Sequence, residues 1–367
     1  MNRKIPIAKP NFGKEEENAV KKVLESGILA SGPRTKSFEK EFADYLGVEH
    51  AVAVTNGTIA LDVALKALKV GPGDEVITSA FSFVASGNCI LFQNAKPVFA
   101  DIDPRTFNID PSDVAEKITA KTKAIIPIHM FGQPAKMDAL KEIVEDKGIM
   151  LLEDAAQAHG AEYKGHKAGS LGDMGCFSFY ATKNMTAGDG GMITTNDQKL
   201  ADKSRLLINH GQSQKYHHDT LGYNYRMTEI CAAIGSVQLR KLDGFNEKRL
   251  ENAQSLSNGV RKFTGLTVPY VDKDVKHVFH QYVVKVEDNY RLERNKLADC
   301  LAENGVGVAV HYPFPIYRQL LYQTLGYGGT VCPNTEEACR RVLSLPVHPL
   351  VVKKDIEYML AVLEEIS

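Results

Sequence analysis

The chain has 367 residues, of which 44% are hydrophobic and 24% are charged, and its formal net charge is −1. These values are ordinary for a globular protein, and the near-neutral charge offers no basic field for nucleic acid or an anionic membrane. No apolar run approaches the roughly 20 residues that a membrane-spanning helix needs. The length predicts one large domain and a smaller one.

The chain shows no targeting or metal-binding pattern. Its start, MNRKIPIAKP, is basic, but no apolar core follows, so we expect no secretory signal. The six cysteines include no CxxC pair, which predicts reduced thiols in a cytoplasmic protein without a metal site. The adjacent His217 and His218 lack the i, i+4 spacing of a helical metal site, and we expect them in a solvated loop.

Helices and strands alternate through the first half of the chain. Two helices are expected within 13–47, separated by a turn at 31–33. Short apolar strands are expected at 51–54, 75–78, 96–100, 124–128, 149–152 and 176–179, with helical segments such as 59–71 and 137–148 between them. This alternation predicts a three-layer α/β/α domain around a mostly parallel sheet, with ligands beyond the carboxyl ends of its strands.

The second half begins with a polar, turn-rich stretch and a long helix over 228–263. We place the large domain at 1–245 and a smaller α+β domain at 246–367. The smaller domain is expected to hold strands at 280–286 and 307–310, a helix at 291–304 and an amphipathic closing helix at 354–366.

The turn after the first expected strand reads Thr55-Asn56-Gly57-Thr58 and leads into a helix. A strand, a tight glycine turn and a helix N-terminus together form an anion site, because free backbone N–H groups and the helix dipole point at the turn. Gly57 would let a phosphate approach, and Thr58 could cap the helix and donate its hydroxyl. A plain α/β turn without a ligand is the alternative interpretation.

Lys183 stands between a short apolar strand and the glycine-rich turn 188–191, with no acid beside it in the sequence. Burial would lower its pKa and yield a free amine, the nucleophile that forms Schiff bases. Asp154 follows the preceding strand, and neighbouring strands lie about 5 Å apart. Such a pair suits pyridoxal phosphate, whose aldehyde the lysine holds and whose ring nitrogen the acid keeps protonated. A surface lysine and a simple helix-capping acid are the alternatives.

Six motifs occur in order along the chain: EDAAQAHGA, FSFYATKN, GDGGMITTND, GYNYRMTEICAAIGSVQL, VHYPFPIY and SLPVHP. With this set the chain resembles, from about Pro6 to its last helix, the DegT/StrS-type aminotransferases. The resemblance implies the fold of aspartate aminotransferase (fold type I) and the cofactor pyridoxal 5'-phosphate. It also implies transfer of an amino group, with L-glutamate as the donor, to a nucleotide-linked keto sugar in a homodimer with shared active sites.

The resemblance also implies a role for individual residues. Lys183 would hold the cofactor covalently, and Asp154 would pair with its ring nitrogen. The other cofactor contacts would come from Gly57, Thr58 and Ser178 at the phosphate, Gln157 at the ring hydroxyl, Phe83 on the ring face, and Asn224 from the partner subunit, with Arg226 ordering its loop. His311 and Tyr312 would lie at the rim of the sugar pocket.

Two departures from the family pattern are visible. The phosphate turn reads NGT where many members have SGT, and Tyr180-Ala181 precedes the lysine where an X-Pro pair is common. Some relatives carry histidine in place of the lysine and remove a sugar hydroxyl. Lys183 favours amino transfer, and the remaining alternatives are a cyclitol-ketone aminotransferase, a dehydratase relative and a non-enzymatic regulator or sensor of the same fold.

Overall fold

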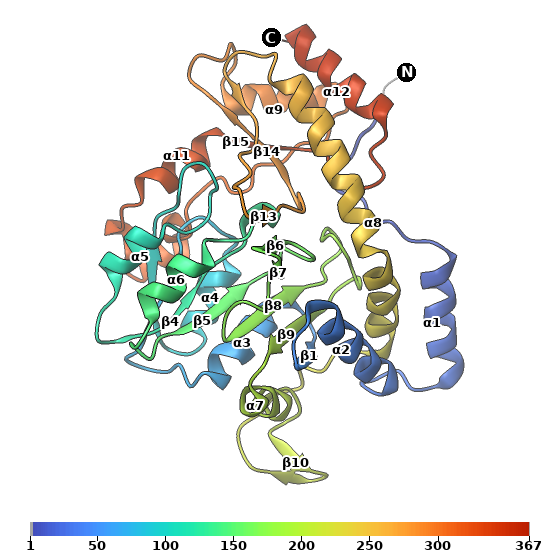
Figure 1. Ribbon diagram of the computed structural model, residues 1–367, viewed down its shortest axis with the longest axis vertical. Coiled ribbons are helices and arrows are strands. Elements are labelled where there is room, and N and C mark those ends of the chain that lie inside the picture. Colours follow the sequence, from blue (N-terminus) through green and yellow to red (C-terminus); the bar gives the residue numbers. More distant parts are fainter. Residues whose placement is uncertain (1–2, 367) are drawn as a thin grey trace.

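The structure is a computed structural model that describes residues 3–366 of the chain. Its centre is a seven-stranded sheet in the order β1-β9-β8-β5-β4-β2-β3 (Figure 1). The strands are β1 (His50–Val54), β2 (Glu75–Ser79), β3 (Lys96–Ala100), β4 (Thr122–Ile126), β5 (Met150–Asp154), β8 (Met174–Ser178) and β9 (Gly191–Thr195). Only β9 runs antiparallel to its neighbours β1 and β8, so the sheet is mostly parallel, as predicted.

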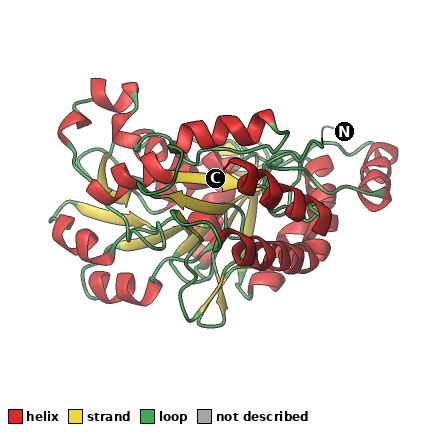
Figure 2. Ribbon diagram, turned by 90° about the horizontal axis from the view of Figure 1, so that it is seen from above, coloured by secondary structure: helices red, strands yellow, loops and turns green. Residues whose placement is uncertain are grey.

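Helices cover both faces of this sheet, which makes three layers (Figure 2). One face packs on α3 (Gly57–Ala67), α4 (Ala85–Leu91) and α7 (Gln198–Ile208). The other face packs on α2 (Pro33–Leu46), α5 (Pro111–Lys117), α6 (Met137–Val144) and the first half of α8 (Glu229–Val260). Successive side chains of a strand point to opposite faces. Thus Cys176 enters the first core, and Phe177 enters the second.

The helix α8 links the large sheet to the C-terminal part of the chain (Figure 1). Its second half packs on a further core that includes α9 (Arg294–Glu303), α12 (Lys353–Ile366) and a small sheet. That sheet has the order β12 (Leu266–Thr267), β14 (Tyr282–Val286), β15 (Val342–Leu345). The predicted domain boundary at 245/246 falls inside α8, which continues unbroken across it. The division at that position therefore stays a prediction.

The chain has further α-helices and strands. They are α1 (Lys14–Ser26), α10 (Leu320–Thr324), α11 (Pro333–Arg341), β6 (Glu162–Tyr163), β7 (His166–Lys167), β13 (Val275–Lys276), β10 (Gln212–Gln214) and β11 (His217–His218). The last two form an exposed hairpin that projects beyond α7 at the foot of Figure 1. His217 and His218 are therefore exposed, as expected.

The predicted three-layer α/β fold and its mostly parallel sheet are confirmed, but two local predictions are wrong, and one alternative interpretation is excluded. Residues 307–310 form no strand, because Gly307 pairs with Ile5 of the N-terminal arm while Ala309 pairs with Ser344. No helix follows Asp154, so that residue is not a helix cap. Thr58 does not cap α3, because the N-cap of that helix is Asn56, whose Oδ1 accepts from Ile59 N at 2.9 Å.

Among the helices of the described residues 3–366, none combines the length and apolar character that crossing a membrane would require. The same residues contain no cluster of three or more His, Cys, Asp or Glu side chains placed to hold a metal ion.

Candidate active site

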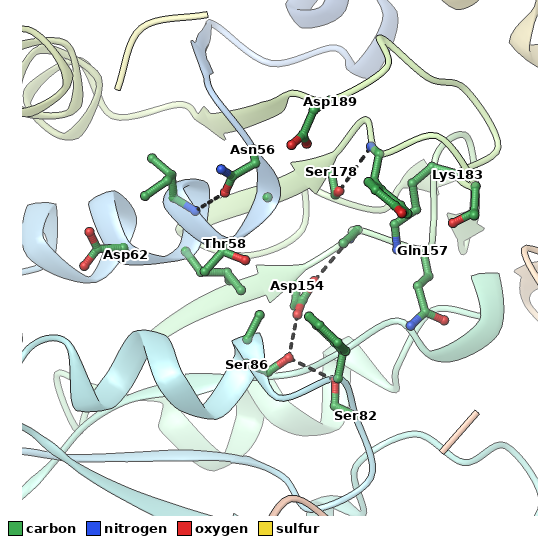
Figure 3. Close-up of a pocket in the computed structure, with 18 of the residues that line it drawn as sticks. Asn56, Thr58, Asp62, Ser82, Ser86, Asp154, Gln157, Ser178, Lys183 and Asp189 are labelled. Atoms are coloured by element: carbon green, nitrogen blue, oxygen red, sulfur yellow. Dashed lines mark hydrogen bonds between the residues drawn. The ribbon is translucent and has the colours of Figure 1, made fainter. Parts of the chain in front are cut away.

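A cavity of about 1040 Å³ opens at the carboxyl ends of β5 and β8 (Figure 3). Nine of the ten residues that we predicted for the site line it: Gly57, Thr58, Phe83, Asp154, Gln157, Ser178, Lys183, His311 and Tyr312. They come from segments up to 255 positions apart (312 − 57) and meet because parallel strands end at one edge of the sheet. Asn224 is not among the lining residues.

Lys183 lies in the loop after β8, with its side chain facing the cavity (Figure 3). Burial lowers its pKa from 10.5 to about 8, although the nearby Asp154 carboxylate opposes the shift. The next residue, Asn184, anchors the loop: its Nδ2 donates to Asn246 Oδ1 of α8 at 2.8 Å and to the carbonyl of Val278 at 3.0 Å. The result is a firmly placed lysine that readily becomes a neutral amine.

Asp154 is the last residue of β5, next to Cys176 of β8 in the sheet. Burial raises its pKa, and hydrogen bonds from the Ser86 hydroxyl and the Ala156 N–H, together with the Lys183 charge, partly offset that rise. Ser86 Oγ donates to Oδ2 at 2.8 Å, and Ala156 N donates to Oδ1 at 3.2 Å. Within residues 3–366 no lysine, arginine or histidine forms a salt bridge with this carboxylate, so it is available to a cationic ligand.

The N-terminus of α3 forms a narrow part of the cavity. Because the first N–H groups of a helix have no acceptor inside it, those of Gly57 and Thr58 are free for a ligand. A Cβ at Gly57 would lie 2.6 Å from Cβ of Ser178, so only glycine allows this close approach. The asparagine of the NGT turn supplies the helix cap, which explains how the turn is held without the serine common in the family.

Gln157 and Tyr312 form the opposite wall. Gln157 Oε1 accepts from Phe131 N at 2.8 Å, and its Nε2 donates to the Tyr312 hydroxyl at 3.2 Å. The ring of Phe83, 58% exposed, lies 6.4 Å from the ring of Tyr312 and is open to a ligand. His311 also lines the cavity, and burial lowers its pKa to about 4.

Asn224 is exposed on the segment that follows the β10–β11 hairpin. Its neighbours Tyr223 and Tyr225 do line the cavity, with their rings stacked 4.7 Å apart. Successive residues of an extended segment point to opposite sides, which explains why Asn224 faces away from its own chain's site. In the sequence GYNYRM the two tyrosines occupy alternate positions, which in an extended segment places them on one side. This spacing could have predicted both tyrosines as cavity residues.

Further lining residues were also missed. They are Asn56, Ile59, Leu61, Asp62, Lys66, Ser82, Ala85, Ser86, Phe92, Ala156, Tyr180, Thr182, Asp189, His280 and Gln281. Ser86 lies three positions after Phe83, the spacing of one helical turn, so the sequence held a hint of it. His280 had no such hint, because only the tertiary structure brings it to Lys183.

These residues fit pyridoxal 5'-phosphate. The helix N-terminus with Gly57 and Ser178 suits a phosphate, the buried Asp154 suits a protonated pyridine nitrogen, and the amine of Lys183 suits an aldehyde. The donors and acceptors of the cavity therefore match the three polar ends of this cofactor.

Comparison with a solved structure supports the same class. The PLP form of the putative sugar aminotransferase Spr1654 from Streptococcus pneumoniae superposes with a TM-score of 0.93 at 30% identity and 100% coverage of both chains. The fold and the site thus define a pyridoxal-phosphate-dependent aminotransferase.

The family follows from the sequence comparison. The model of the DegT/DnrJ/EryC1/StrS aminotransferase family matches residues 10–364, and the chain belongs to this family. It is similar to the spore coat polysaccharide biosynthesis protein SpsC of Bacillus subtilis, at 40% identity over 100% of this chain and 97% of that protein. It is also similar to the GDP-perosamine synthase of Caulobacter vibrioides, at 38% identity over 99% and 98% of the two chains.

Proposed function

We propose that this chain transfers the amino group of L-glutamate to a nucleotide-linked keto sugar. The observation that carries the proposal is the meeting of Lys183 and Asp154 in one large cavity. The relatives named above support the sugar as acceptor, since one synthesises GDP-perosamine and another acts in polysaccharide biosynthesis. We place the reaction in amino-sugar biosynthesis in the cytoplasm.

Six residues of the site have a task in binding the cofactor in this proposal. The free N–H groups of Gly57 and Thr58 and the hydroxyl of Ser178 bind the phosphate of the cofactor, and Lys183 holds its aldehyde. Asp154 keeps the ring nitrogen protonated, and Ser86 holds the carboxylate in place. When bound, the cofactor supplies an electron sink for the carbon that loses a proton.

Lys183 moves the proton. Once an amino donor has displaced it, Nζ gives up its proton more easily than an ordinary lysine does, because burial lowers its pKa to about 8. As a general acid–base it would take the proton from Cα of glutamate and deliver it on the cofactor side. The keto acid leaves before the keto sugar enters, and the same steps run in reverse, so the kinetics are ping-pong.

We further propose that the active unit is a homodimer with shared sites. Asn224 faces away from its own cavity next to a projecting hairpin, and a phosphate dianion uses more donors than Gly57, Thr58 and Ser178 supply. The exposed segment would lend Asn224 to the partner's phosphate site, and symmetry would make the exchange reciprocal.

A substrate screen tests the proposed reaction. The purified protein with its cofactor is given L-glutamate and a panel of nucleotide-linked 3-keto and 4-keto sugars, and 2-oxoglutarate is measured. We expect production with at least one of these sugars and none with the Lys183→Ala variant. A cyclitol ketone in the same panel tests the main alternative, an aminotransferase that acts on such a ketone. Turnover of the cyclitol ketone alone would contradict a nucleotide-linked substrate.

A further inference from the structure

His280 lies two residues before the start of β14 and lines the cavity together with Lys183 and Gln157, yet it has no role in the chemistry above. Its side chain is almost completely buried, with 6% of the residue exposed. The backbone there is held firmly, because Arg249 Nη1 of α8 donates to the carbonyls of Phe279 at 3.1 Å and His280 at 3.3 Å. The imidazole is thus fixed in place at the cavity wall.

Two asparagines determine which ring nitrogen of His280 carries a proton. Asn246 Nδ2 donates to the carbonyl of His159 at 2.8 Å, which leaves Asn246 Oδ1 as an acceptor. Asn184 Nδ2 donates to that Oδ1 and to the carbonyl of Val278. A backbone carbonyl only accepts, so the orientation of both amides is set. Asn184 Oδ1 must then be an acceptor, and it lies 3.2 Å from Nδ1 of His280.

Nδ1 of His280 is therefore the donor and carries the hydrogen. Burial lowers the pKa of this imidazole well below its ordinary value, and the charges of Lys183 and Arg249 and the rings of His311 and His159 act in the same direction. The imidazole is neutral, so Nε2 carries a lone pair. Within residues 3–366 no donor reaches Nε2, so in a residue that lines the cavity this lone pair is left without a protein partner.

We infer that Nε2 of His280 is a fixed hydrogen-bond acceptor that selects a hydroxyl group on the keto sugar. The inference rests on the proposed function and names a specificity residue for it. A lone pair repels a carbonyl or carboxylate oxygen and is satisfied by an O–H. A buried acceptor without its donor is costly, so a sugar lacking this hydroxyl is disfavoured. The carboxylates of glutamate only accept, so they gain nothing from this atom.

The tautomer can be tested without substrate. Two-dimensional NMR of protein labelled with ¹⁵N in its histidine rings distinguishes a protonated from a bare ring nitrogen, and a His280→Gln variant assigns the signal. We expect hydrogen on Nδ1 and a bare Nε2 at neutral pH. Hydrogen on Nε2 would overturn the inference whatever the substrate is.

The specificity is tested with a keto sugar that the enzyme uses and its analogues, each lacking one hydroxyl. We expect kcat/KM of the wild type to fall about 10- to 100-fold for one analogue. In His280→Phe, kcat/KM for the parent sugar should fall by a similar factor. The same variant should keep the wild-type kcat/KM for that analogue and the wild-type rate of the glutamate half-reaction. His280→Gln, which retains an acceptor, should recover part of the loss and also serves if the Phe variant does not fold.

An equal loss with every analogue, or with glutamate, would overturn the role that we assign to His280. Failure of every keto sugar with the wild type would instead contradict the proposed function. The two failures are thus distinguishable.

Discussion

Lys183 is the residue on which the proposed chemistry depends most, and burial disfavours the positive charge of its side chain. Removing its amine takes away both the covalent anchor and the proton carrier. We expect Lys183→Ala to lose at least about two orders of magnitude in turnover, the usual contribution of general acid–base catalysis, while its fold remains intact. Initial rates with circular dichroism as the folding control check this. More than a few per cent of wild-type activity would contradict the assignment.

The same lysine predicts a pH effect on the cofactor-free protein. Its folded pKa of about 8 lies below the unfolded value of 10.5, so between these values the unfolded chain holds more protons. Stability should therefore rise with pH across this window, by up to about 3 kcal/mol, and the burial cost should be fully present below pH 8. Urea unfolding across the window measures the rise. The Lys183→Met variant should lack the contribution of Lys183 to this rise in the free energy of unfolding. An identical rise in the variant would show that the effect does not come from Lys183.

Asp154 provides the second prediction on a single side chain. Asp154→Asn keeps the size but removes the negative charge from a buried position. We expect the cofactor still to attach at Lys183, as its visible absorbance would show, while turnover falls about 100-fold or more, the scale of a lost electrostatic partner. Single-turnover kinetics with glutamate measure the change. A rate near that of the wild type would leave Asp154 with a structural role only.

At the scale of elements, the first turn of α8 stabilises the start of α2. Glu229 of α8 is buried, and its carboxylate accepts from the N–H groups of Gly32, Arg34 and Thr35 at 2.8–2.9 Å and from the Thr35 hydroxyl at 2.7 Å. It therefore satisfies helix N–H groups that have no partner within α2.

We expect Glu229→Ala to lower the free energy of unfolding by about 2–4 kcal/mol, because it leaves these buried donors unpaired. A matched control lies on the same helix: Glu251 is exposed and forms a surface ion pair with Lys248. Glu251→Ala should change stability by less than about 0.5 kcal/mol. Chemical denaturation measures the free energy of unfolding of both variants. Equal losses in the two variants would show that the contacts of Glu229 contribute little to stability.

At the scale of the whole molecule, shared active sites can be tested by subunit mixing. One inactive dimer carries Lys183→Ala and the other a bulky substitution of Asn224. In a mixed dimer one site collects both defects and the other collects neither, so activity should return to up to half the level of a wild-type dimer. Native mass spectrometry verifies the exchange. Verified exchange without activity would mean that Asn224 does not serve the partner's site.

Much of this architecture could be predicted from local patterns. The alternation of apolar strands and helices predicted the sheet, and the glycine turn at 55–58 predicted the free helix N-terminus. The strand predicted at 307–310 was wrong, because its apolar residues contact two different partners and form only isolated bridges. The cap of α3 was assigned to Thr58 instead of Asn56, because both residue types favour such positions.

The sequence by itself determined the strand ends at which Asp154 and Lys183 stand, because strand and turn signals are local and parallel strands end at a common edge. Only the tertiary structure decided which polar atoms meet there. Ser86 reaches Asp154, and His280 reaches Asn184 across 96 positions (280 − 184), through contacts that follow no period in the sequence. Such contacts depend on how whole helices and loops pack.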